Sequence, residues 1–309
     1  MMKADKQEEK IMLVSMKEIC ARAKEGHYGV PALTSGNEHI VRSAIEAAEE
    51  KNSPLILLCN VKAPDFQYLG KVIKDLATQS RVPVAAILDH GPSYESAVLA
   101  VKANLTDIMI DKSSEPYEVN VAETKKVCEL AHAAGMYVEA ELGHVGNADN
   151  YEEDGHTAFT DPETAVRFVE ETGCDFLAVA VGTAHGQYPK GMKPEIQFEL
   201  LKELREKVPV PLVLHGGSGS GDENIAEACR LGITKVNLAN DLYQGCIKEV
   251  LEHDWSSGWA AYGFYGTVAE GYKKVARHYF DVCGSTGKAW TKEPQGLTSK
   301  AESETVKEG

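Results

Sequence analysis

Eight short apolar runs, each followed by a segment of helical length, constrain the fold of this chain more than any other feature of its sequence. Strands that alternate with helices of about 10–15 residues form parallel βαβ units, because parallel neighbours need a long crossover connection. Eight such units fit a (β/α)8 barrel better than an open doubly wound sheet, which carries a Gly-rich loop after its first strand. The strands are expected at residues 29–33, 55–60, 82–88, 107–110, 136–142, 176–181, 211–214 and 235–238.

Start and stop signals for helices lie between these runs. Asp161-Pro162 is typical of a helix start, and Gly135, Gly173 and Gly232 each follow a helical run, where glycine commonly ends a helix. Helices are expected at residues 38–51, 66–78, 93–103, 117–134, 162–172, 195–207, 222–231, 241–253 and 265–282.

The two ends of the chain fall outside this alternation. A helix near residues 16–25 precedes the first strand and is expected to cap the bottom of the barrel. Residues 291–309 are charged and rich in Ser, Thr and Glu, so we expect a disordered tail there. The predicted fold class is therefore α/β: a single-domain (β/α)8 TIM barrel over residues 1–290, with a short N-terminal helix and a disordered C-terminal tail.

The charge of the chain argues against two classes of partner. It has 32 Lys and Arg against 47 Asp and Glu, a net charge of −15, whereas nucleic-acid binders and proteins of anionic membrane surfaces need clustered positive charge. No apolar stretch approaches the roughly 18 residues of a membrane span, so we expect a cytoplasmic protein. The seven Cys form no C-x-x-C pair, which indicates neither a disulfide framework nor a thiolate zinc site.

Three histidines follow expected strands three, six and seven, at the rim where enzymes of this fold carry their chemistry. Three His ligands plus an open position make a common catalytic-zinc set, and His90, His185 and His215 are flanked by glycines. The alternative is that each histidine makes hydrogen bonds only within its own loop and binds no metal.

Carboxylates lie at the same rim. Asp89 directly precedes His90, so one of the pair can bind a metal while the other faces a substrate in an acid–base role. Asp111 and Glu141 can supply oxygen ligands for an alternative or second metal position. Each of the three can instead be a hydrogen-bonding carboxylate of the barrel.

A glycine-rich run, residues 216–221, leads from the seventh strand into a helix expected at residue 222. Backbone N–H groups in such a turn suit a phosphate, and in this fold the phosphate site often follows strands seven and eight, although a plain turn is the alternative. Lys112, after strand four, is the one exposed-looking cation of the rim. A Schiff-base role for Lys112 is less favoured than a charge contact or a solvated side chain.

Several of these motifs, in this order, resemble the class II ketose-bisphosphate aldolases over roughly residues 12–290. The runs that carry the resemblance are residues 88–91, 109–111, 138–143, 177–186 and 211–219. The resemblance implies a zinc-dependent cleavage of fructose bisphosphate, tagatose bisphosphate or a close analogue to dihydroxyacetone phosphate and an aldehyde. It also implies a phosphorylated sugar as the partner, a homodimer or homotetramer, and a monovalent cation (Na⁺ or K⁺) near the Gly-rich loop.

The resemblance also implies residue roles. His90, His185 and His215 would hold the zinc, with Asp111 and Glu141 at positions that can take a second metal. Asp89 would be the proton donor and acceptor at the substrate hydroxyl. Asp149, or else Glu152, would be the base that exchanges the proton on carbon. The residues that would surround dihydroxyacetone phosphate are Gly186, Gly216, Gly217, Ser218, Asn237, Leu238, Ala239 and Asn240.

This sequence departs from the family pattern at its substrate contacts. Where the family usually reads Asn-x-Asp-Thr after strand eight, this chain has residues 237–240, Asn-Leu-Ala-Asn. The usual Ala-Phe-Asn after strand one is replaced by residues 32–34, Ala-Leu-Thr. Two alternatives to an aldolase stay open: a metal-dependent hydrolase on the same barrel, and a sugar-phosphate-binding protein without catalysis, which the altered residues after strand eight favour.

Overall fold

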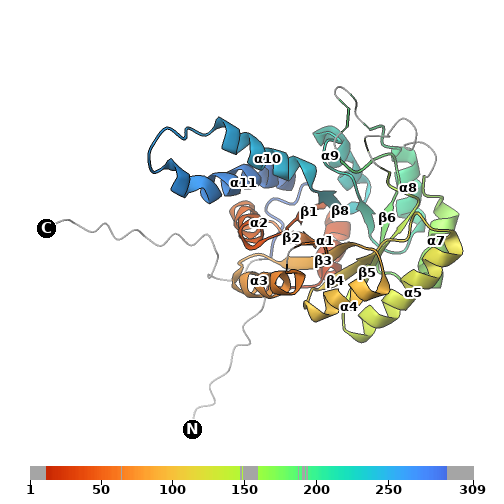
Figure 1. The fold of residues 1–309 in the computed structure, drawn as a ribbon. Coiled ribbons are helices and arrows are strands. Elements are labelled where there is room, and N and C mark those ends of the chain that lie inside the picture. The colour runs from red at the N-terminus through yellow and green to blue at the C-terminus, as the bar shows by residue number, and fades with distance from the viewer. Residues whose placement is uncertain are drawn as a thin grey trace, which may run out of the picture.

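The computed structural model describes residues 12–63, 65–146, 148, 159–186, 188–189, 192 and 194–290. Within them eight parallel strands pair in chain order and the eighth pairs with the first, which closes the barrel (Figure 1). The predicted (β/α)8 fold is therefore confirmed. The strands are β1 Val30–Thr34, β2 Leu55–Cys59, β3 Val84–Gly91, β4 Asp107–Ile110, β5 Tyr137–Leu142, β6 Phe176–Val179, β7 Leu212–Leu214 and β8 Ile233–Leu238.

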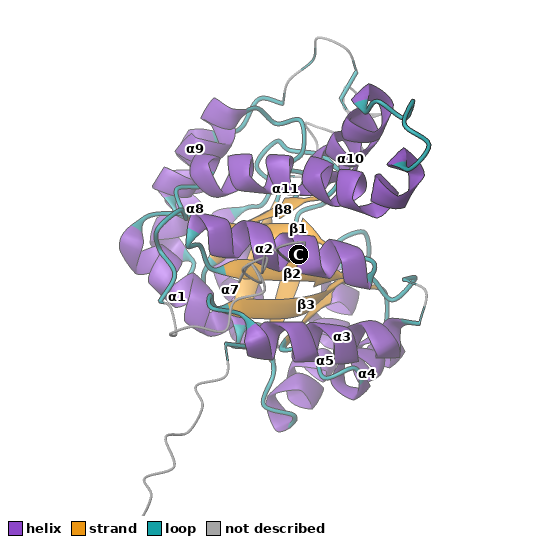
Figure 2. Ribbon diagram, turned by 90° about the vertical axis from the view of Figure 1, so that its left-hand side faces the viewer, coloured by secondary structure: helices purple, strands orange, loops and turns teal. Residues whose placement is uncertain are grey.

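Helices surround the strands on the outside (Figure 2). Three of the predicted helices, those at residues 38–51, 162–172 and 222–231, have the predicted bounds. The helices are α1 Met16–Gly26, α2 Glu38–Lys51, α3 Phe66–Gln79, α4 Tyr94–Lys102, α5 Tyr117–Ala133, α7 Pro162–Thr172, α8 Phe198–Lys207, α9 Asp222–Leu231, α10 Asn240–Glu252, η2 Ala260–Gly263 and α11 Phe264–Val282.

Helix α1 closes the bottom of the barrel, as the sequence predicts. Its buried face, which includes Met16 and Ile19, packs into the cluster of apolar side chains inside the barrel. The backbone N–H of Met16 also donates to Oδ2 of the buried Asp107 at 2.8 Å. The barrel interior is thus filled from below, and its open end is the carboxyl end of the strands.

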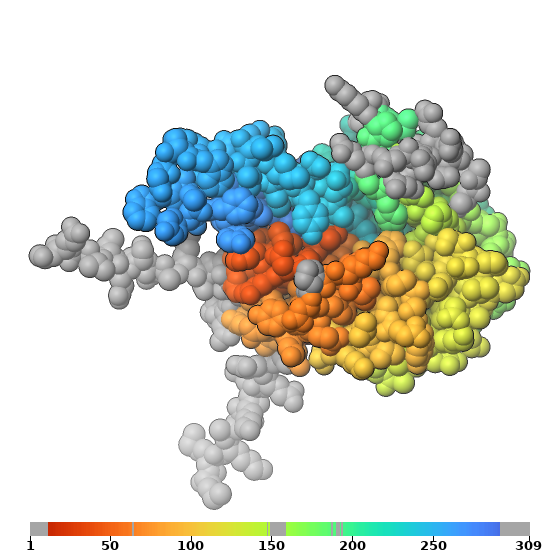
Figure 3. Space-filling model, in the orientation of Figure 1, coloured from red at the N-terminus to blue at the C-terminus, as the bar shows by residue number. Residues whose placement is uncertain are grey.

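Helices α10 and α11 pack against each other, and α11 also packs against α2. The ends of the two helices that are joined by η2 project from the barrel (Figures 1 and 3). We call residues 240–282 the helical arm. The two helices cross where Gly245 faces Gly271: a Cβ on Gly271 would lie 2.5 Å from the carbonyl oxygen of Gly245. Only glycine allows this close approach.

No helix in the described part of the chain is both long enough and apolar enough to cross a membrane. The predicted tail, residues 291–309, lies outside the described residues, and so do Asp149 and Glu152.

Candidate active site

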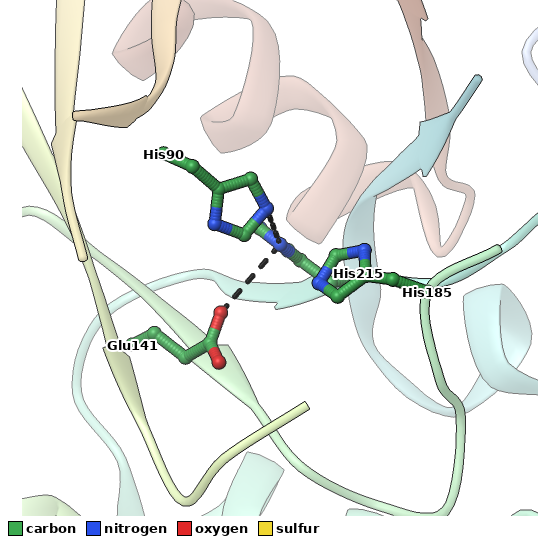
Figure 4. Close-up of side chains that lie close together, drawn as sticks. All are labelled: His90, Glu141, His185 and His215. Carbon is green, nitrogen blue, oxygen red and sulfur yellow. Dashed lines mark hydrogen bonds and ion pairs between the residues drawn. The ribbon is translucent and has the colours of Figure 1, made fainter. Parts of the chain in front are cut away.

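The three predicted histidines meet at the open end of the barrel (Figure 4). His90 is the second-last residue of β3, while His185 and His215 follow β6 and β7. Their ring centroids lie 4.8 Å (His90 to His185), 4.7 Å (His90 to His215) and 5.6 Å (His185 to His215) apart. The three imidazoles are therefore close enough to share one small ligand.

Strand β3 runs further than predicted, to Gly91 instead of residue 88, and so carries Asp89 and His90. Its pairing with β4 shifts register between Leu88 and Gly91, and His90 has a φ of 46°. This left-handed conformation costs a non-glycine residue on the order of 1 kcal/mol and is typical of functional sites. The irregularity turns His90 toward the other two histidines.

Glu141 on β5 completes the cluster: one side-chain ligand atom from each of the four residues lies within 4.8 Å of the others. One oxygen, Oε1, accepts the backbone N–H of Val145 at 3.1 Å. The other, Oε2, is buried, makes no hydrogen bond to any described residue and lies 3.6 Å from Nδ1 of His215. Burial, together with the nearby Asp111, raises the pKa of Glu141 to about 8.

Asp111 contacts His90 on the side that faces away from this cluster. Its Oδ2 lies 2.7 Å from Nδ1 of His90, and its Oδ1 accepts hydrogen bonds from the backbone and the hydroxyl of Ser113. Burial of His90 disfavours its charged form, but the hydrogen bond with Asp111 and the nearby carboxylates of Asp89 and Glu141 together outweigh burial and raise the pKa of His90 to about 9. Burial would raise the pKa of Asp111, yet the bonds from His90 and Ser113 lower it.

His215 is fully buried and is held from below by a carboxylate to which the sequence interpretation gave no role. Its Nε2 lies 2.8 Å from Oε1 of Glu139 on β5, and Lys235 on β8 donates to both oxygens of Glu139. Burial lowers the pKa of His215. Burial also lowers the pKa of His185, to about 4, so these two imidazoles are neutral near pH 7.

A pocket of about 190 Å³ opens beside the histidines. All but one of the predicted substrate contacts line it, and Asp89, Thr34 and Leu58 line it as well. The exception is Gly217, whose N–H donates to the carbonyl of Asn237 at 3.1 Å and whose α-carbon is turned toward Val236 of β8. Lys112 is not among the described residues that line the pocket. The predicted contacts that do line it are Gly186, Gly216, Ser218, Asn237, Leu238, Ala239 and Asn240.

Asp89 is held in the pocket by a neighbour on β8. The side-chain amide of Asn237 donates to Oδ1 of Asp89 at 3.1 Å. The amide oxygen of Asn237 is buried without a hydrogen-bond partner among the described residues. Asp89 therefore faces the pocket with a fixed orientation, and Asn237 offers a free acceptor beside it.

The loops after β7 and β8 are tied together where a phosphate site was predicted. The hydroxyl oxygen of Ser218 accepts the backbone N–H groups of Ala239 and Asp241 at 3.2 and 3.3 Å. The carboxylate of Asp241 in turn accepts the N–H of Gly219 at 3.0 Å and the hydroxyl of Tyr279. These contacts fix the Gly-rich turn against the start of α10.

The donor set at the cluster fits a metal ion. Three imidazoles with a carboxylate suit Zn²⁺ or a similar divalent metal, and the unpartnered Oε2 of Glu141 is a buried acceptor that such an ion would satisfy. His90, His185, His215 and Glu141 are thus the residues that can hold the ion. Asp111 touches this set only through His90.

Comparison with known proteins agrees with this chemistry. Residues 14–288 match the family model described as fructose-bisphosphate aldolase class-II. A fructose-bisphosphate aldolase of Thermus caldophilus is 37% identical over 306 residues, which cover 90% of this chain and 100% of that protein. These matches extend over the whole barrel.

Solved structures of named or putative aldolases share the fold. The YdjI aldolase of Escherichia coli K12 superposes with a TM-score of 0.80 at 33% identity and covers 90% of this chain and 99% of its own. A putative fructose-1,6-biphosphate aldolase of Coccidioides immitis gives a TM-score of 0.77 at 28% identity over 88% of this chain and 96% of its own. With its histidine cluster at the open end of an eight-stranded barrel, the chain belongs to the class II fructose-bisphosphate aldolase family and is an aldolase, a carbon–carbon lyase.

Proposed function

We propose that this aldolase uses zinc to cleave a ketose bisphosphate, either fructose or tagatose bisphosphate or a close analogue, to dihydroxyacetone phosphate and an aldehyde. The observation that carries the proposal is the convergence of His90, His185, His215 and Glu141 beside a pocket into which Asp89 faces. The Thermus caldophilus relative, named a fructose-bisphosphate aldolase, supports this substrate class.

In this mechanism Asp89 accepts the proton of the hydroxyl group next to the carbon–carbon bond that breaks, and returns it in the reverse reaction. Asn237 keeps the carboxylate of Asp89 in place through the 3.1 Å hydrogen bond. When bound, the zinc would polarise the substrate ketone and stabilise the negative charge that develops on its oxygen.

The remaining parts of the pocket bind the phosphorylated half of the substrate. The Gly-rich turn at Gly216 and Ser218 precedes the N-terminus of α9, and such N–H-rich turns favour phosphate. A monovalent cation (Na⁺ or K⁺) near this turn remains part of the proposal. We also propose Asp149 as the base for the carbon proton, and Asp111 with Glu141 as a second metal position.

The proposal is tested with the metal removed and returned. Protein treated with a chelator should release no dihydroxyacetone phosphate from fructose 1,6-bisphosphate or tagatose 1,6-bisphosphate, and added Zn²⁺ should restore the release. A zinc-loaded protein that neither cleaves these sugars nor exchanges the C3 proton of dihydroxyacetone phosphate would overturn the substrate assignment.

We further propose that the protein is cytoplasmic, that residues 1–290 act as one domain, and that it forms a homodimer or homotetramer through the helical arm. Tyr243, Ile247 and Leu251 on α10 are spaced by four residues, share one face and are exposed. Trp259 and Tyr262 at the tip of the arm are 75% and 84% exposed.

The arm exposes enough apolar surface for a stable interface between copies. Its exposed apolar side chains present roughly 600–1,000 Å², close to the ~800 Å² that each partner buries in a typical interface. The described barrel leaves this face uncovered, and the two chain ends outside the described residues are highly charged. A second copy of this chain, which offers the same apolar face, suits it best.

Light scattering coupled to size-exclusion chromatography tests the arm. The double variant Ile247→Lys/Leu251→Lys should elute as a monomer, while Tyr68→Ser, which removes an exposed aromatic side chain from α3, should keep the oligomer of the parent protein. An unchanged mass for the double variant would contradict the proposed interface.

A further inference from the structure

A charged pair lies inside the barrel directly below His215. Glu139 on β5 and Lys235 on β8 are both fully buried. Lys235 donates to Oε1 and Oε2 of Glu139 at 3.0 and 2.8 Å, and Oε1 lies 2.8 Å from Nε2 of His215. The three side chains therefore form a continuous chain of contacts from the barrel interior to the metal-binding cluster.

Stability alone does not explain this pair. Most of the side chains that fill the barrel are apolar, among them Ile56, Phe176 and Val213. Taking two charges out of water is costly, and replacing a buried ion pair by apolar residues of similar volume is often neutral or stabilising. The Glu139–Lys235 ion pair below His215 therefore points to a role that apolar side chains cannot fill.

The contact with Glu139 determines which nitrogen of His215 carries the proton. A carboxylate that already accepts hydrogen bonds from an ammonium group accepts one more from Nε2, so Nε2 is the protonated nitrogen. The amide nitrogen of Asn237 lies 3.3 Å from Nε2, but the contact of Nε2 with the Glu139 carboxylate is shorter, at 2.8 Å, and charge-assisted, so it determines the protonated nitrogen.

The lone pair of Nδ1 then faces the cluster. Nδ1 lies 3.1 Å from Nε2 of His90 and 3.6 Å from Oε2 of Glu141. In this tautomer the ring presents an unprotonated nitrogen to a metal without any rearrangement.

We propose that Glu139 and Lys235 are positioning residues that fix the tautomer and the ring orientation of His215 for metal binding. Lys235 holds both carboxylate oxygens, so Glu139 cannot rotate away from His215. The inference rests on the metal-binding part of the proposed function, and assigns a role to two residues that contact neither metal nor substrate.

The first test uses the unmodified protein without metal. In a sample labelled with ¹⁵N at histidine, the imidazole of His215, assigned by comparison with His215→Gln, should show a protonated Nε2 and an unprotonated Nδ1. A protonated Nδ1 would overturn the proposal.

The second test replaces the pair at similar volume, with Glu139→Leu/Lys235→Leu. We expect this variant to bind Zn²⁺ 10–100-fold more weakly, in competition with a chromophoric chelator, since loss of a residue that orients a metal-binding histidine typically has an effect of this size. Asp107→Asn is the matched control, because Asp107 is a fully buried barrel carboxylate hydrogen-bonded to Met16 and not to a histidine.

The outcomes separate this inference from the proposed function. Zinc affinity of the double variant within threefold of the parent protein would show that the pair serves the barrel alone, and would overturn the inference. If the double variant does not fold, the tautomer measurement on the parent protein decides. A parent protein that binds zinc but cleaves no ketose bisphosphate would overturn the proposed substrate and leave the inference standing.

Discussion

Nδ1 of His90 lies 2.7 Å from Oδ2 of Asp111, while Nε2 of the same ring lies 3.1 Å from Nδ1 of His215. The two ends of this imidazole therefore have different tasks. The outer nitrogen donates to a carboxylate, and the inner nitrogen is left to face the metal-binding cluster.

This relationship predicts the effect of Asp111→Asn. Because Ser113 donates twice to Oδ1, the new amide oxygen should stay at that position and its NH₂ group should face Nδ1 of His90. The neutral ring of His90 then keeps its proton on Nε2 instead of Nδ1, and we expect zinc affinity to fall roughly 10–100-fold in a chelator competition assay.

Asp175→Asn is a suitable control for that variant. Asp175 contacts His132 at 2.8 Å, a similar carboxylate–imidazole pair that lies just before β6, whereas His185 of the cluster follows the other end of that strand. If Asp111 is itself a ligand of a second metal, its variant should also bind fewer zinc ions per chain. Unchanged affinity and stoichiometry would contradict both roles.

Asp89→Asn should abolish turnover and leave metal binding intact. The variant keeps the size of the side chain but removes the proton acceptor beside the pocket, and general acid–base groups typically contribute about 10²–10⁴-fold to the rate. The measurement is kcat for ketose bisphosphate cleavage together with the zinc content of the purified protein. A kcat within tenfold of the parent, at equal zinc content, would show that another group accepts the proton.

The barrel was predictable because its signal repeats. Each βα unit places a buried strand before an amphipathic helix, and local caps such as Asp161, which accepts the N–H of Thr164 at 2.8 Å, mark the helix ends. The rim histidines followed from the rule that parallel strands present their carboxyl ends on one side.

Other features depend on contacts that no local pattern contains. The expected third strand ends at residue 88, before Asp89, whereas β3 continues through Asp89 and His90 to Gly91 with a shift in register. The position of Lys235 in the sequence does indicate that its side chain lies inside the barrel. It lies two residues before Asn237 on a buried strand, so both side chains point to the same face, into the barrel.

Gly271→Ala should destabilise the helical arm. Its new Cβ would lie 2.5 Å from the carbonyl oxygen of Gly245 and 2.8 Å from Cα of Cys246, so α10 and α11 would have to separate. Overpacking of this kind costs about 1–3 kcal/mol, which lowers Tm by several degrees in a chain of this size.

Gly266→Ala, on the same helix, provides the comparison. A Cβ there meets no atom within 4 Å, so the better helix propensity of Ala should leave Tm unchanged or slightly higher. Equal Tm values for both variants by differential scanning calorimetry would mean that the two helices are not in contact at Gly271.

Asp107 makes the stability of the fold depend on pH. Burial raises the pKa of its carboxyl from 3.8 to about 7, and Oδ1 is buried without a hydrogen bond to any described residue. Between about pH 4 and 7 the folded protein therefore holds a proton that the unfolded chain has released. The stability contributed by this proton is complete below pH 4 and is lost as the pH rises through 7.

Asp107→Asn removes that dependence, because an amide does not titrate and its oxygen can still accept the N–H of Met16. Relative to the parent protein, the variant should gain roughly 2–4 kcal/mol of stability between pH 4.5 and 8, seen as a rising difference in Tm. Calorimetry of both proteins at pH 4.5, 6 and 8, in the presence of a chelator, measures it. The exposed Asp75→Asn should show no such trend, and parallel Tm curves for Asp107→Asn and the parent would mean that Asp107 is already charged at pH 4.5 in the folded state.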